Sequence, residues 1–287
     1  MAGAARTIRD PAAMRAAVLE SRAAGRRVGF VPTMGALHAG HASLVERAVA
    51  ECDDVAVSIF VNPTQFGPGE DFARYPRAPE ADAVLLERLG VRWIHAPGAD
   101  DVYPPGSATR VVVEGPAMAF EGRARPGHFT GVATVVCRLF HAVPAHAAYF
   151  GAKDWQQTLV VGRMVRDLGL PVEIVVCPTI REPDGLALSS RNAYLAPDER
   201  SRAVGLFESL EVAAAGWAGG ADVAAVERAM RAALEARGVA IDYAAVADAE
   251  TLGAPVAGRA AVALVAGRVG ATRLIDNRLL GPRGGRP

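Results

Sequence analysis

The stretch that decides the fold is Val28-Gly29-Phe30-Val31-Pro32-Thr33-Met34-Gly35-Ala36-Leu37-His38-Ala39-Gly40-His41. Its first four residues form a short apolar run with β-branched members, which predicts a buried strand that ends at Pro32. Apolar residues at helical spacing then predict a helix from about His41 to Glu51. A strand, a glycine-containing turn and a helix start can together bind phosphate, because unpaired backbone N–H groups and the positive end of the helix dipole face the ligand.

Two histidines three residues apart, His38 and His41, lie beside this predicted helix start. Taken alone they could be a metal pair or two solvated loop residues. No further Cys or His lies nearby at ligand spacing, which argues against zinc. Imidazole groups beside a phosphate-binding turn can instead stabilise the negative charge that develops on a transferring phosphoryl group. The segment has neither a GxGxxG fingerprint nor the GKS or GKT of a P-loop.

Composition excludes several classes of protein. The chain has 287 residues, enough for two domains, and its 31 Lys and Arg balance its 31 Asp and Glu, so net charge favours neither nucleic acid nor membrane as a partner. Cys52, Cys137 and Cys177 are dispersed without a CxxC pair, which predicts buried, reduced thiols. No apolar run is long enough to span a membrane, and the N-terminal residues lack a signal-peptide core, so we expect a cytoplasmic enzyme.

Apolar runs alternate with helical patterns along the first 180 residues. Helices are predicted from Asp10 to Gly25, over about 80–89 and from Thr130, which would cap its helix; strands are predicted at 55–61, 93–94, 110–113 and 172–176. This alternation predicts an α/β fold with a doubly wound, Rossmann-like parallel sheet whose ligands bind at the carboxyl ends of the strands.

The character of the sequence changes from Pro197. Two Ala-rich helices are predicted at about 197–217 and 222–237, followed by short strands near 241–246, 260–265 and 272–275. Residues 178–184 are interpreted as the exit from the first domain, so we divide the chain into a Rossmann-like domain, residues 1–180, expected to bind nucleotide and substrate at its strand ends, and a smaller α+β C-terminal lid domain, residues 181–287.

Four further polar segments follow predicted strands or turns. They are Asn62–Phe66 (NPTQF), Arg125–Phe129 (RPGHF), Gly151–Gln157 (GAKDWQQ) and Asp184–Asn192 (DGLALSSRN). Singly, each has an ordinary interpretation: an Asn-Pro turn, a solvated loop, a helix start facing water, a capping tripeptide. Lys153 and Arg191 could also bind phosphate, Lys153 as a mobile point charge and Arg191 as a planar fork.

Pro32 to His41 resembles the HxGH-type loop of the nucleotidyltransferase superfamily, and more closely the signature of the pantoate–β-alanine ligase family. The four later segments match the same family in order, so five separated motifs agree. One difference stands out: this chain has Ala152 where most members have glutamate, while Lys153, Asp154 and Gln157 match. We expect activity to survive this difference.

The resemblance implies ATP-dependent condensation of pantoate with β-alanine through a pantoyl adenylate, releasing pyrophosphate and AMP, in pantothenate and coenzyme A biosynthesis. It implies ATP as a substrate, Mg²⁺ accompanying it, and a homodimer; the sequence offers no protein-only metal site. Carboxylate and triphosphate repel each other, so the site must supply positive charge and hydrogen-bond donors.

The resemblance also assigns roles to individual residues. As catalytic residues it implies His41, His38, Lys153 and Arg191. As residues that bind ATP it implies Met34, Gly35, His38, His41, Gly151, Lys153, Asp154, Ile180, Leu188, Ser189, Ser190 and Arg191. As residues that bind pantoate it implies Gln65, Gln157, Asn62 and Arg125. The glycine- and proline-containing segment 67–79 suits a mobile gate over a cleft.

Two other functions remain open at this stage. A different HxGH nucleotidyltransferase would share the histidine loop without needing NPTQF or RPGHF. A non-catalytic nucleotide-binding regulator would not need His38, His41, Lys153 and Arg191 together.

Overall fold

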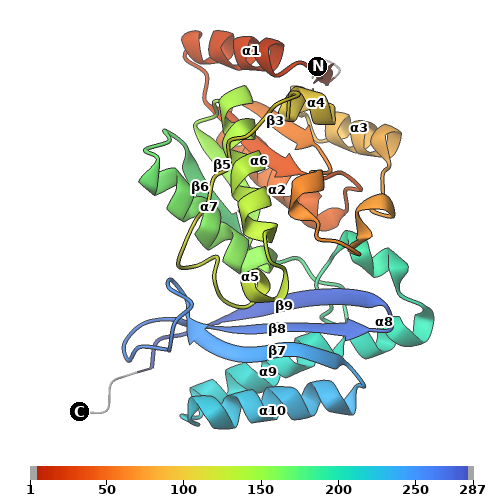
Figure 1. The fold of residues 1–287 in the computed structure, drawn as a ribbon, viewed down its shortest axis with the longest axis vertical. Coiled ribbons are helices and arrows are strands. Elements are labelled where there is room, and N and C mark those ends of the chain that lie inside the picture. The colour runs from red at the N-terminus through yellow and green to blue at the C-terminus, as the bar shows by residue number, and fades with distance from the viewer. Residues whose placement is uncertain (1–4, 284–287) are drawn as a thin grey trace. The chain divides into compact units, whose positions relative to one another are not determined.

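The structure is a computed structural model that describes residues 5–283 (Figure 1). The chain forms two compact units, Met1–Ala152 with Gln157–Pro178, and Lys153–Gln156 with Thr179–Pro287.

The first unit is built on a six-stranded parallel sheet with the order β1-β4-β3-β2-β5-β6. The strands are β1 (Arg6–Ile8), β2 (Val28–Thr33), β3 (Asp54–Ile59), β4 (Trp93–His95), β5 (Ala147–Gly151) and β6 (Glu173–Cys177). From β2 the chain adds β3 and β4 in one direction and later β5 and β6 in the other. The direction therefore reverses between β2 and β5, and this switch point is where such sheets bind ligands.

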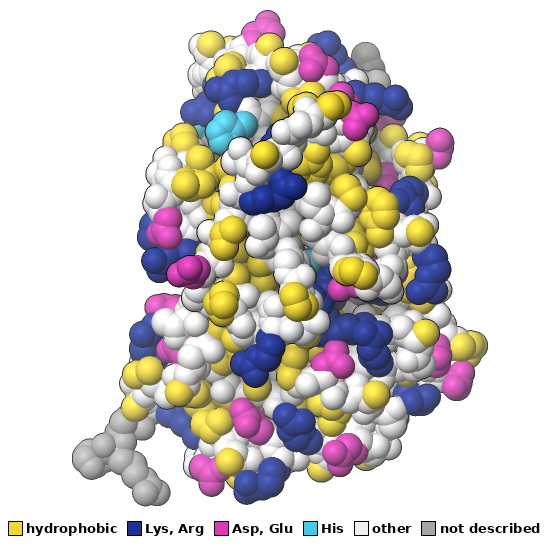
Figure 2. All heavy atoms as spheres, in the orientation of Figure 1, with side chains coloured by type: hydrophobic (Ala, Val, Ile, Leu, Met, Phe, Trp, Pro, Cys, Tyr) yellow, Lys and Arg dark blue, Asp and Glu magenta, His cyan; other side chains and the backbone are white. Residues whose placement is uncertain are grey.

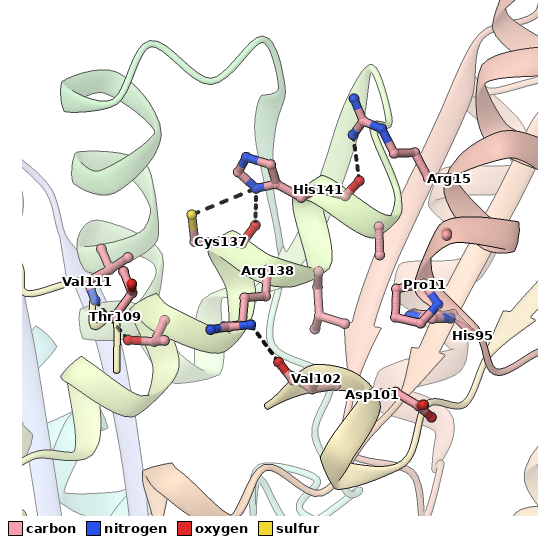
Figure 3. A pocket seen from close by; sticks show the side chains of 14 residues that line it. Pro11, Arg15, His95, Asp101, Val102, Thr109, Val111, Cys137, Arg138 and His141 are labelled. Atoms are coloured by element: carbon pink, nitrogen blue, oxygen red, sulfur yellow. Dashed lines mark hydrogen bonds between the residues drawn. The ribbon is translucent and has the colours of Figure 1, made fainter. Parts of the chain in front are cut away.

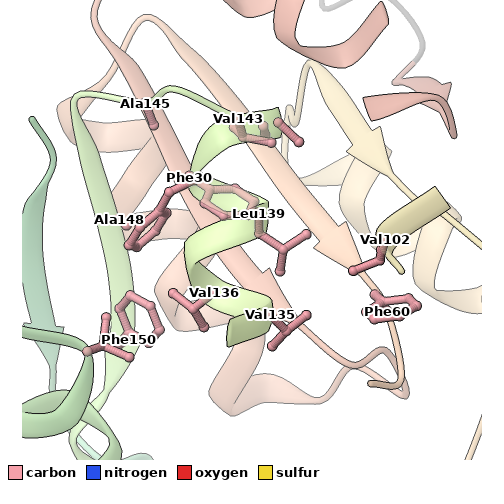
Figure 4. Packing of buried hydrophobic residues seen from close by; sticks show 14 of the residues in the cluster. Phe30, Phe60, Val102, Val135, Val136, Leu139, Val143, Ala145, Ala148 and Phe150 are labelled. Atoms are coloured by element: carbon pink, nitrogen blue, oxygen red, sulfur yellow. The ribbon is translucent and has the colours of Figure 1, made fainter. Parts of the chain in front are cut away.

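Helices cover both faces of this sheet. They are α1 (Pro11–Ala23), α2 (Ala39–Glu51), α3 (Pro79–Arg88), the short α4 (Ala99–Val102) and α5 (Glu121–Ala124), α6 (His128–Ala142) and α7 (Trp155–Asp167). One apolar layer joins α1, α6 and α7 to the sheet, and Figure 4 shows Val136 and Leu139 of α6 beside Phe30 and Phe150 of the strands. A second layer joins α2 and α3 to the sheet. The prediction of a doubly wound α/β sheet is confirmed.

The boundaries of α1 follow the signals in the sequence. Asp10 accepts hydrogen bonds from the backbone N–H groups of Ala12 and Ala13 at 3.2 and 3.1 Å, and Pro11 occupies the first helical turn. Gly25 lies beyond the helix end with φ +77°, a conformation that suits glycine.

The second unit contains a three-stranded antiparallel sheet with the order β7-β8-β9. Its elements are α8 (Pro197–Ala203), α9 (Gly205–Ala218), α10 (Val223–Ala236), β7 (Ala240–Asp248), β8 (Ala261–Val269) and β9 (Thr272–Leu280). Leu206 and Leu210 of α9, Met230 and Leu234 of α10, and Val265 of β8 are fully buried in its core. The predicted smaller α+β region is confirmed.

Two predictions about strands were wrong. The predicted strand at 110–113 is absent, because the N–H group of Val111 donates to the side chain of Thr134 at 2.9 Å instead of to a neighbouring strand. Pro32 does not end its strand. The carbonyl of Thr33 accepts from the N–H of Phe60 and so faces β3, and the nitrogen of the preceding residue, Pro32, therefore faces the β5 side. On that side β2 pairs with β5 only as far as Phe30, so the N–H that proline lacks is not needed for pairing.

Two predictions about helices were also wrong. Thr130 does not cap α6, which begins at His128 after Gly127 turns the chain with φ +85°. The helix expected at 197–217 is two helices, α8 and α9, that meet at Gly205. A Cβ on Gly205 would lie 2.7 Å from Cβ of Arg237, so the break occurs where a glycine allows close approach.

Surface charge is mixed, as the balanced composition suggests. On the face shown in Figure 2, Lys and Arg side chains are interspersed with Asp and Glu side chains. The three cysteines are free, but only Cys177 is buried; Cys52 and Cys137 are half-buried, so the prediction of buried thiols was wrong for these two. Within residues 5–283, no helix has both the length and the apolar character needed to cross a membrane.

Candidate active site

The loop after β2 is shaped by its own side chains and by glycine. The hydroxyl of Thr33 donates to the carbonyl of Ser58 at 2.7 Å and accepts from the N–H of Gly35 at 3.2 Å. Gly35 has φ +84°, and a Cβ there would lie 2.9 Å from Cγ2 of Ile59. Glycine is therefore required at this turn.

A buried carboxylate that sequence reasoning missed holds the same loop. Asp82 of α3, only 3% exposed, accepts the N–H groups of Ala36 at 2.9 Å and Leu37 at 2.7 Å. Both oxygens are thus used to fix the backbone that leads to His38. An aspartate among the apolar positions of a helix was the available signal, but nothing in the sequence named its partners.

His38 and His41 lie together at the start of α2. Their ring centroids are 4.1 Å apart. His38 is the N-cap residue, and its Nδ1 accepts the N–H of Gly40 at 3.1 Å, while Nδ1 of His41 faces the N–H of His38 at 3.4 Å. Because a backbone N–H can only donate, each neutral imidazole carries its proton on Nε2. Both rings can then act as hydrogen-bond donors through Nε2.

Met34, Asn62 and Gln65 are brought together from two loops. Asn62 Nδ2 donates to Gln65 Oε1 at 3.1 Å, and Gln65 Nε2 contacts the sulfur of Met34 at 3.1 Å. Asn62 also caps the short 3₁₀ helix η1 (Pro63–Gln65) by accepting the N–H of Thr64 at 3.3 Å. The amide of Gln65 therefore has a fixed orientation, with its NH₂ group against a weakly accepting thioether.

Arg125 and His128 hold the backbone of Gln65. The carbonyl oxygen of Gln65 lies 2.9 Å from Nδ1 of His128 and accepts from Nη2 of Arg125 at 3.4 Å. Arg125 also binds Glu70 through two hydrogen bonds of 2.8 and 2.7 Å. Burial, followed by the charge of Arg125, lowers the pKa of His128 to about 4. At neutral pH, His128 is therefore an uncharged donor to the Gln65 carbonyl.

Gly151 and Gln157 complete the predicted residues of the first unit. Gly151 is the last residue of β5, next to β2 in the sheet, and Gln157 is a half-buried residue of α7. Both belong to the strand and helix on the β5 side of the switch point.

In the second unit, Ile180 and Leu188 face each other across a narrow turn. The N–H of Leu188 donates to the carbonyl of Ile180 at 3.0 Å. Gly185 at the turn has φ +94° and packs against Phe207 so closely that a Cβ would clash with the ring. The two predicted nucleotide-contacting residues therefore lie opposite each other on the two arms of one hairpin-like turn.

A second ion pair that the sequence did not reveal fixes this turn. Arg181 binds Asp276 of β9 at 2.6 and 3.0 Å, and the carboxylate of Asp276 is 1% exposed. The next residue, Asn277, donates to the carbonyl of Lys153 at 2.7 Å and accepts from Arg181 at 3.3 Å. Strand β9 thereby holds Lys153 and the 180–188 turn side by side. Nζ of Lys153 lies 3.9 Å from Asp154.

Ser189, Ser190 and Arg191 follow this turn directly. Ser189 Oγ accepts the N–H of Arg191 at 3.3 Å and so caps the 3₁₀ helix η4 (Ser190–Tyr194). Asn192 Nδ2 donates to the carbonyl of Ala187 at 3.1 Å. The two hydroxyl-bearing residues and the arginine are therefore part of one short, internally bonded segment.

A cavity of about 490 Å³ lies elsewhere in the first unit, among α1, α4 and α6 (Figure 3). The residues that line it, such as Arg15, His95, Arg138 and His141, include none of the predicted site residues. Most of the polar groups are already bonded, since Arg15 donates to the carbonyl of His141 and Arg138 to that of Val102. His95 is fully buried, with Nδ1 3.0 Å from the carbonyl of Ile8.

Comparison with known proteins identifies the family. Residues 6–279 match the family model described as pantoate-beta-alanine ligase. The chain is 53% identical to a pantothenate synthetase of Rubrobacter xylanophilus over 95% of this chain and 98% of that protein. It is 56% identical to a pantothenate synthetase of Thermus thermophilus over 91% of this chain and 96% of that protein.

Solved structures agree. A pantothenate synthetase from Thermus thermophilus superposes with a TM-score of 0.90 at 52% identity, covering 96% of this chain and all of that one. The chain also superposes on a pantoate-beta-alanine ligase from Francisella tularensis that is complexed with beta-gamma ATP and beta-alanine. The TM-score is 0.81 at 33% identity, and the match covers 96% of this chain and 98% of that one. Fold, motif order and sequence identity over nearly the whole length agree, so this chain belongs to the pantoate–β-alanine ligase family.

Proposed function

We propose that this chain condenses pantoate with β-alanine in two ATP-dependent steps. The pantoate carboxylate attacks the α-phosphorus of ATP, which forms pantoyl adenylate and releases pyrophosphate. The amine of β-alanine then attacks the acyl carbon, which forms the amide and releases AMP. Family membership supports this reaction, and the Francisella tularensis ligase complexed with beta-gamma ATP and beta-alanine supports the two co-substrates.

The observation that carries the assignment is the histidine pair at the start of α2. Nδ1 of each ring faces a backbone N–H group, so a neutral His38 or His41 carries its proton on Nε2 and can donate from that atom. We assign these donors to the phosphate oxygens of ATP, where they stabilise the charge that develops during adenylate formation. Met34 and Gly35, in the same loop, would border the nucleotide.

A second group of residues would act on the rest of the triphosphate. Lys153 and Arg191 would neutralise phosphate charge, and Ser189 and Ser190 would donate hydroxyl hydrogen bonds to single oxygens. The remaining residues of this group, Gly151, Asp154, Ile180 and Leu188, would border the nucleotide. Strand β9 supports this role because it fixes the Lys153 backbone beside the 180–188 turn.

We assign pantoate to the amide groups. Gln65 and Gln157 would hydrogen-bond its hydroxyls and carboxylate, and Asn62 would orient Gln65. Arg125 would border this site, where its contacts with Glu70 and the Gln65 carbonyl keep the loop in place. In this proposal residues 1–180 form the domain that binds both substrates, and residues 181–287 act as a lid.

Magnesium would enter with ATP. Among residues 5–283, no three His, Cys, Asp or Glu side chains are grouped to hold a metal ion, so its ligands would be phosphate oxygens and water. The ion would neutralise phosphate charge.

We also place the enzyme in the cytoplasm as a homodimer. Free cysteines at positions 52, 137 and 177 suit a reducing compartment, and Val112 and Met118, 68% and 67% exposed, offer apolar surface to a second copy. Sedimentation and cell fractionation test these two points.

Pantoate-dependent exchange of labelled pyrophosphate into ATP tests the function itself. We expect exchange in the wild type, and about a 10²-fold or greater loss in His41→Ala and in Lys153→Ala. Exchange that required a nucleoside monophosphate instead of pantoate would favour another nucleotidyltransferase. Pyrophosphate exchange and pantothenate formation both absent would favour a regulator.

A further inference from the structure

Asn62 is the centre of a buried hydrogen-bond network behind Gln65. Its side chain is 1% exposed and contacts three segments of the first unit. Nδ2 donates to Gln65 Oε1 at 3.1 Å and to the carbonyl of Gly131 in α6 at 3.2 Å. Oδ1 accepts from the N–H and the hydroxyl of Thr64 at 3.3 and 3.0 Å, and from the hydroxyl of Tyr103 at 2.9 Å.

Backbone groups decide which end of this amide is which. The carbonyl of Gly131 can only accept a hydrogen bond, so the atom of Asn62 that faces it must be Nδ2. The N–H of Thr64 can only donate, so the atom that faces it must be Oδ1. The orientation of Asn62 then fixes the orientation of Gln65. The oxygen of Gln65 faces Asn62, and its NH₂ group is left to face Met34.

Tyr103 reaches Asn62 with a side chain from a distant part of the chain, outside η1. It follows α4, and its hydroxyl also lies 3.1 Å from Thr64 Oγ1. Burial raises the pKa of Tyr103, so its hydroxyl stays protonated and can donate at every physiological pH.

The ring of Tyr103 is held in place from the other side. Cζ of Arg138 lies 5.2 Å from the ring centroid, within the range of a cation–π contact. Arg138 is itself fixed, because it donates to the carbonyl of Val102 at 2.7 Å and to Ser107 Oγ at 2.6 Å. The hydroxyl is therefore delivered to Asn62 from a rigid support.

We propose that Tyr103 is a positioning residue for pantoate: through Asn62 it holds the amide of Gln65 so that its NH₂ group is aimed at the substrate. This inference rests on the proposed role of Gln65. Tyr103 acts through Asn62 and does not touch pantoate. The NH₂ group of Gln65 faces the thioether of Met34, which is a weak acceptor. A hydroxyl or carboxylate oxygen of pantoate would accept a stronger hydrogen bond from this group.

The first test is Tyr103→Phe, which removes the hydroxyl and keeps the ring on Arg138. A typical hydrogen bond contributes enough to raise KM for pantoate roughly 2- to 10-fold when it is lost. KM for ATP and for β-alanine should stay within about 2-fold of wild type, since neither is assigned to this amide pair.

Tyr149→Phe is the matched control. Tyr103 is half-buried, and Tyr149 is a fully buried tyrosine of the first unit whose hydroxyl contacts Glu51 at 3.0 Å and Cys52 at 3.3 Å. This variant loses the same chemical group but should leave KM for pantoate unchanged. An equal rise in both variants would overturn the inference, because it would reflect general loosening of the core.

A double-mutant cycle shows whether Tyr103 acts through Asn62. In an Asn62→Ala background, Tyr103→Phe should change KM for pantoate by less than about 2-fold, because the connection is already broken. Additive effects would overturn the inference.

Gln65→Ala separates this inference from the proposed function. If Gln65→Ala leaves KM for pantoate unchanged, the assignment of pantoate to Gln65 fails. If Gln65→Ala raises KM for pantoate while Tyr103→Phe behaves like Tyr149→Phe, only the positioning role of Tyr103 fails.

Discussion

Arg125 binds Glu70 through a two-point ion pair, with Nε to Oε1 at 2.8 Å and Nη2 to Oε2 at 2.7 Å. Burial alone would raise the pKa of Glu70, but the hydrogen bonds and charge of Arg125 outweigh it and lower the pKa to about 2. Glu70 lies in the segment expected to form a gate, so this pair ties that segment to the carbonyl of Gln65 through Arg125.

Glu70→Gln should lower stability at pH 7 by about 1–3 kcal/mol, because the largely buried guanidinium of Arg125 keeps its charge and loses its negative partner. Glu70 has a lower pKa when folded than its ordinary 4.5, so its stabilisation is present above pH 4.5 and is lost as pH falls toward 2. The difference in urea midpoint between wild type and variant should therefore shrink over this range.

Asp167→Asn is the control for this prediction. Asp167 pairs with Arg163 at 2.7 Å, but both side chains are about half exposed, at 51% and 53%. Its loss should change stability by less than about 1 kcal/mol. A Glu70→Gln variant as stable as Asp167→Asn at pH 7 would contradict the prediction.

Asp82→Asn should disturb the histidine loop. The carboxylate accepts one N–H with each oxygen, from Ala36 and Leu37. An asparagine would place an NH₂ group against one of these donors, at a cost of about 1–3 kcal/mol, and pantoate-dependent pyrophosphate exchange should fall. Asp101→Asn, whose carboxylate accepts the exposed N–H of Gly98 at 2.7 Å, should keep normal exchange. Equal exchange rates in the two variants would show that Asp82 does not shape the loop.

Gly131→Ala should displace Gln65. A Cβ at this position of α6 would lie 2.4 Å from the carbonyl oxygen of Thr64 and 2.7 Å from Cα of Gln65. We expect a loss of about 1–3 kcal/mol in stability and a higher KM for pantoate.

Gly162→Ala provides the opposite expectation within a similar helix. A Cβ on Gly162 of α7 meets nothing within 4 Å, so alanine should stabilise the protein by about 0.5–1 kcal/mol and leave KM unchanged. Thermal unfolding and initial rates check both glycine variants, and a neutral Gly131→Ala would mean that α6 can move away from η1.

Asp276→Ala should destabilise the second unit by about 3–5 kcal/mol, because it removes the buried partner of Arg181. It should also weaken ATP binding, since Asn277, the next residue, holds the backbone of Lys153. Asp184→Ala breaks the more exposed pair with Arg200 and should cost no more than about 1 kcal/mol. Denaturant unfolding and the KM for ATP are measured for both variants. Equal stability and equal KM for ATP in the two would show that β9 does not support the turn.

Local signals predicted much of the fold. Asp10 and Gly25 delimit α1 as capping rules require, and the apolar runs at 28–31, 55–61 and 172–176 became β2, β3 and β6. Errors occurred where a side chain or a glycine changed a local preference. Thr134 takes the N–H of Val111, and the left-handed Gly127 starts α6 before Thr130.

The sequence by itself determined the strand–turn–helix units, the parallel sheet and the five motifs, because periodicity and turn chemistry act over a few neighbouring residues. Only the tertiary structure decided that Asp82 would fix the histidine loop, that Tyr103 would reach Asn62, and that Asp276 would hold Arg181. These partners are separated by 41 to 95 residues, and no short-range pattern encodes such a distance. They meet because the burial of apolar layers brings the elements together, and each buried polar group must then find a partner.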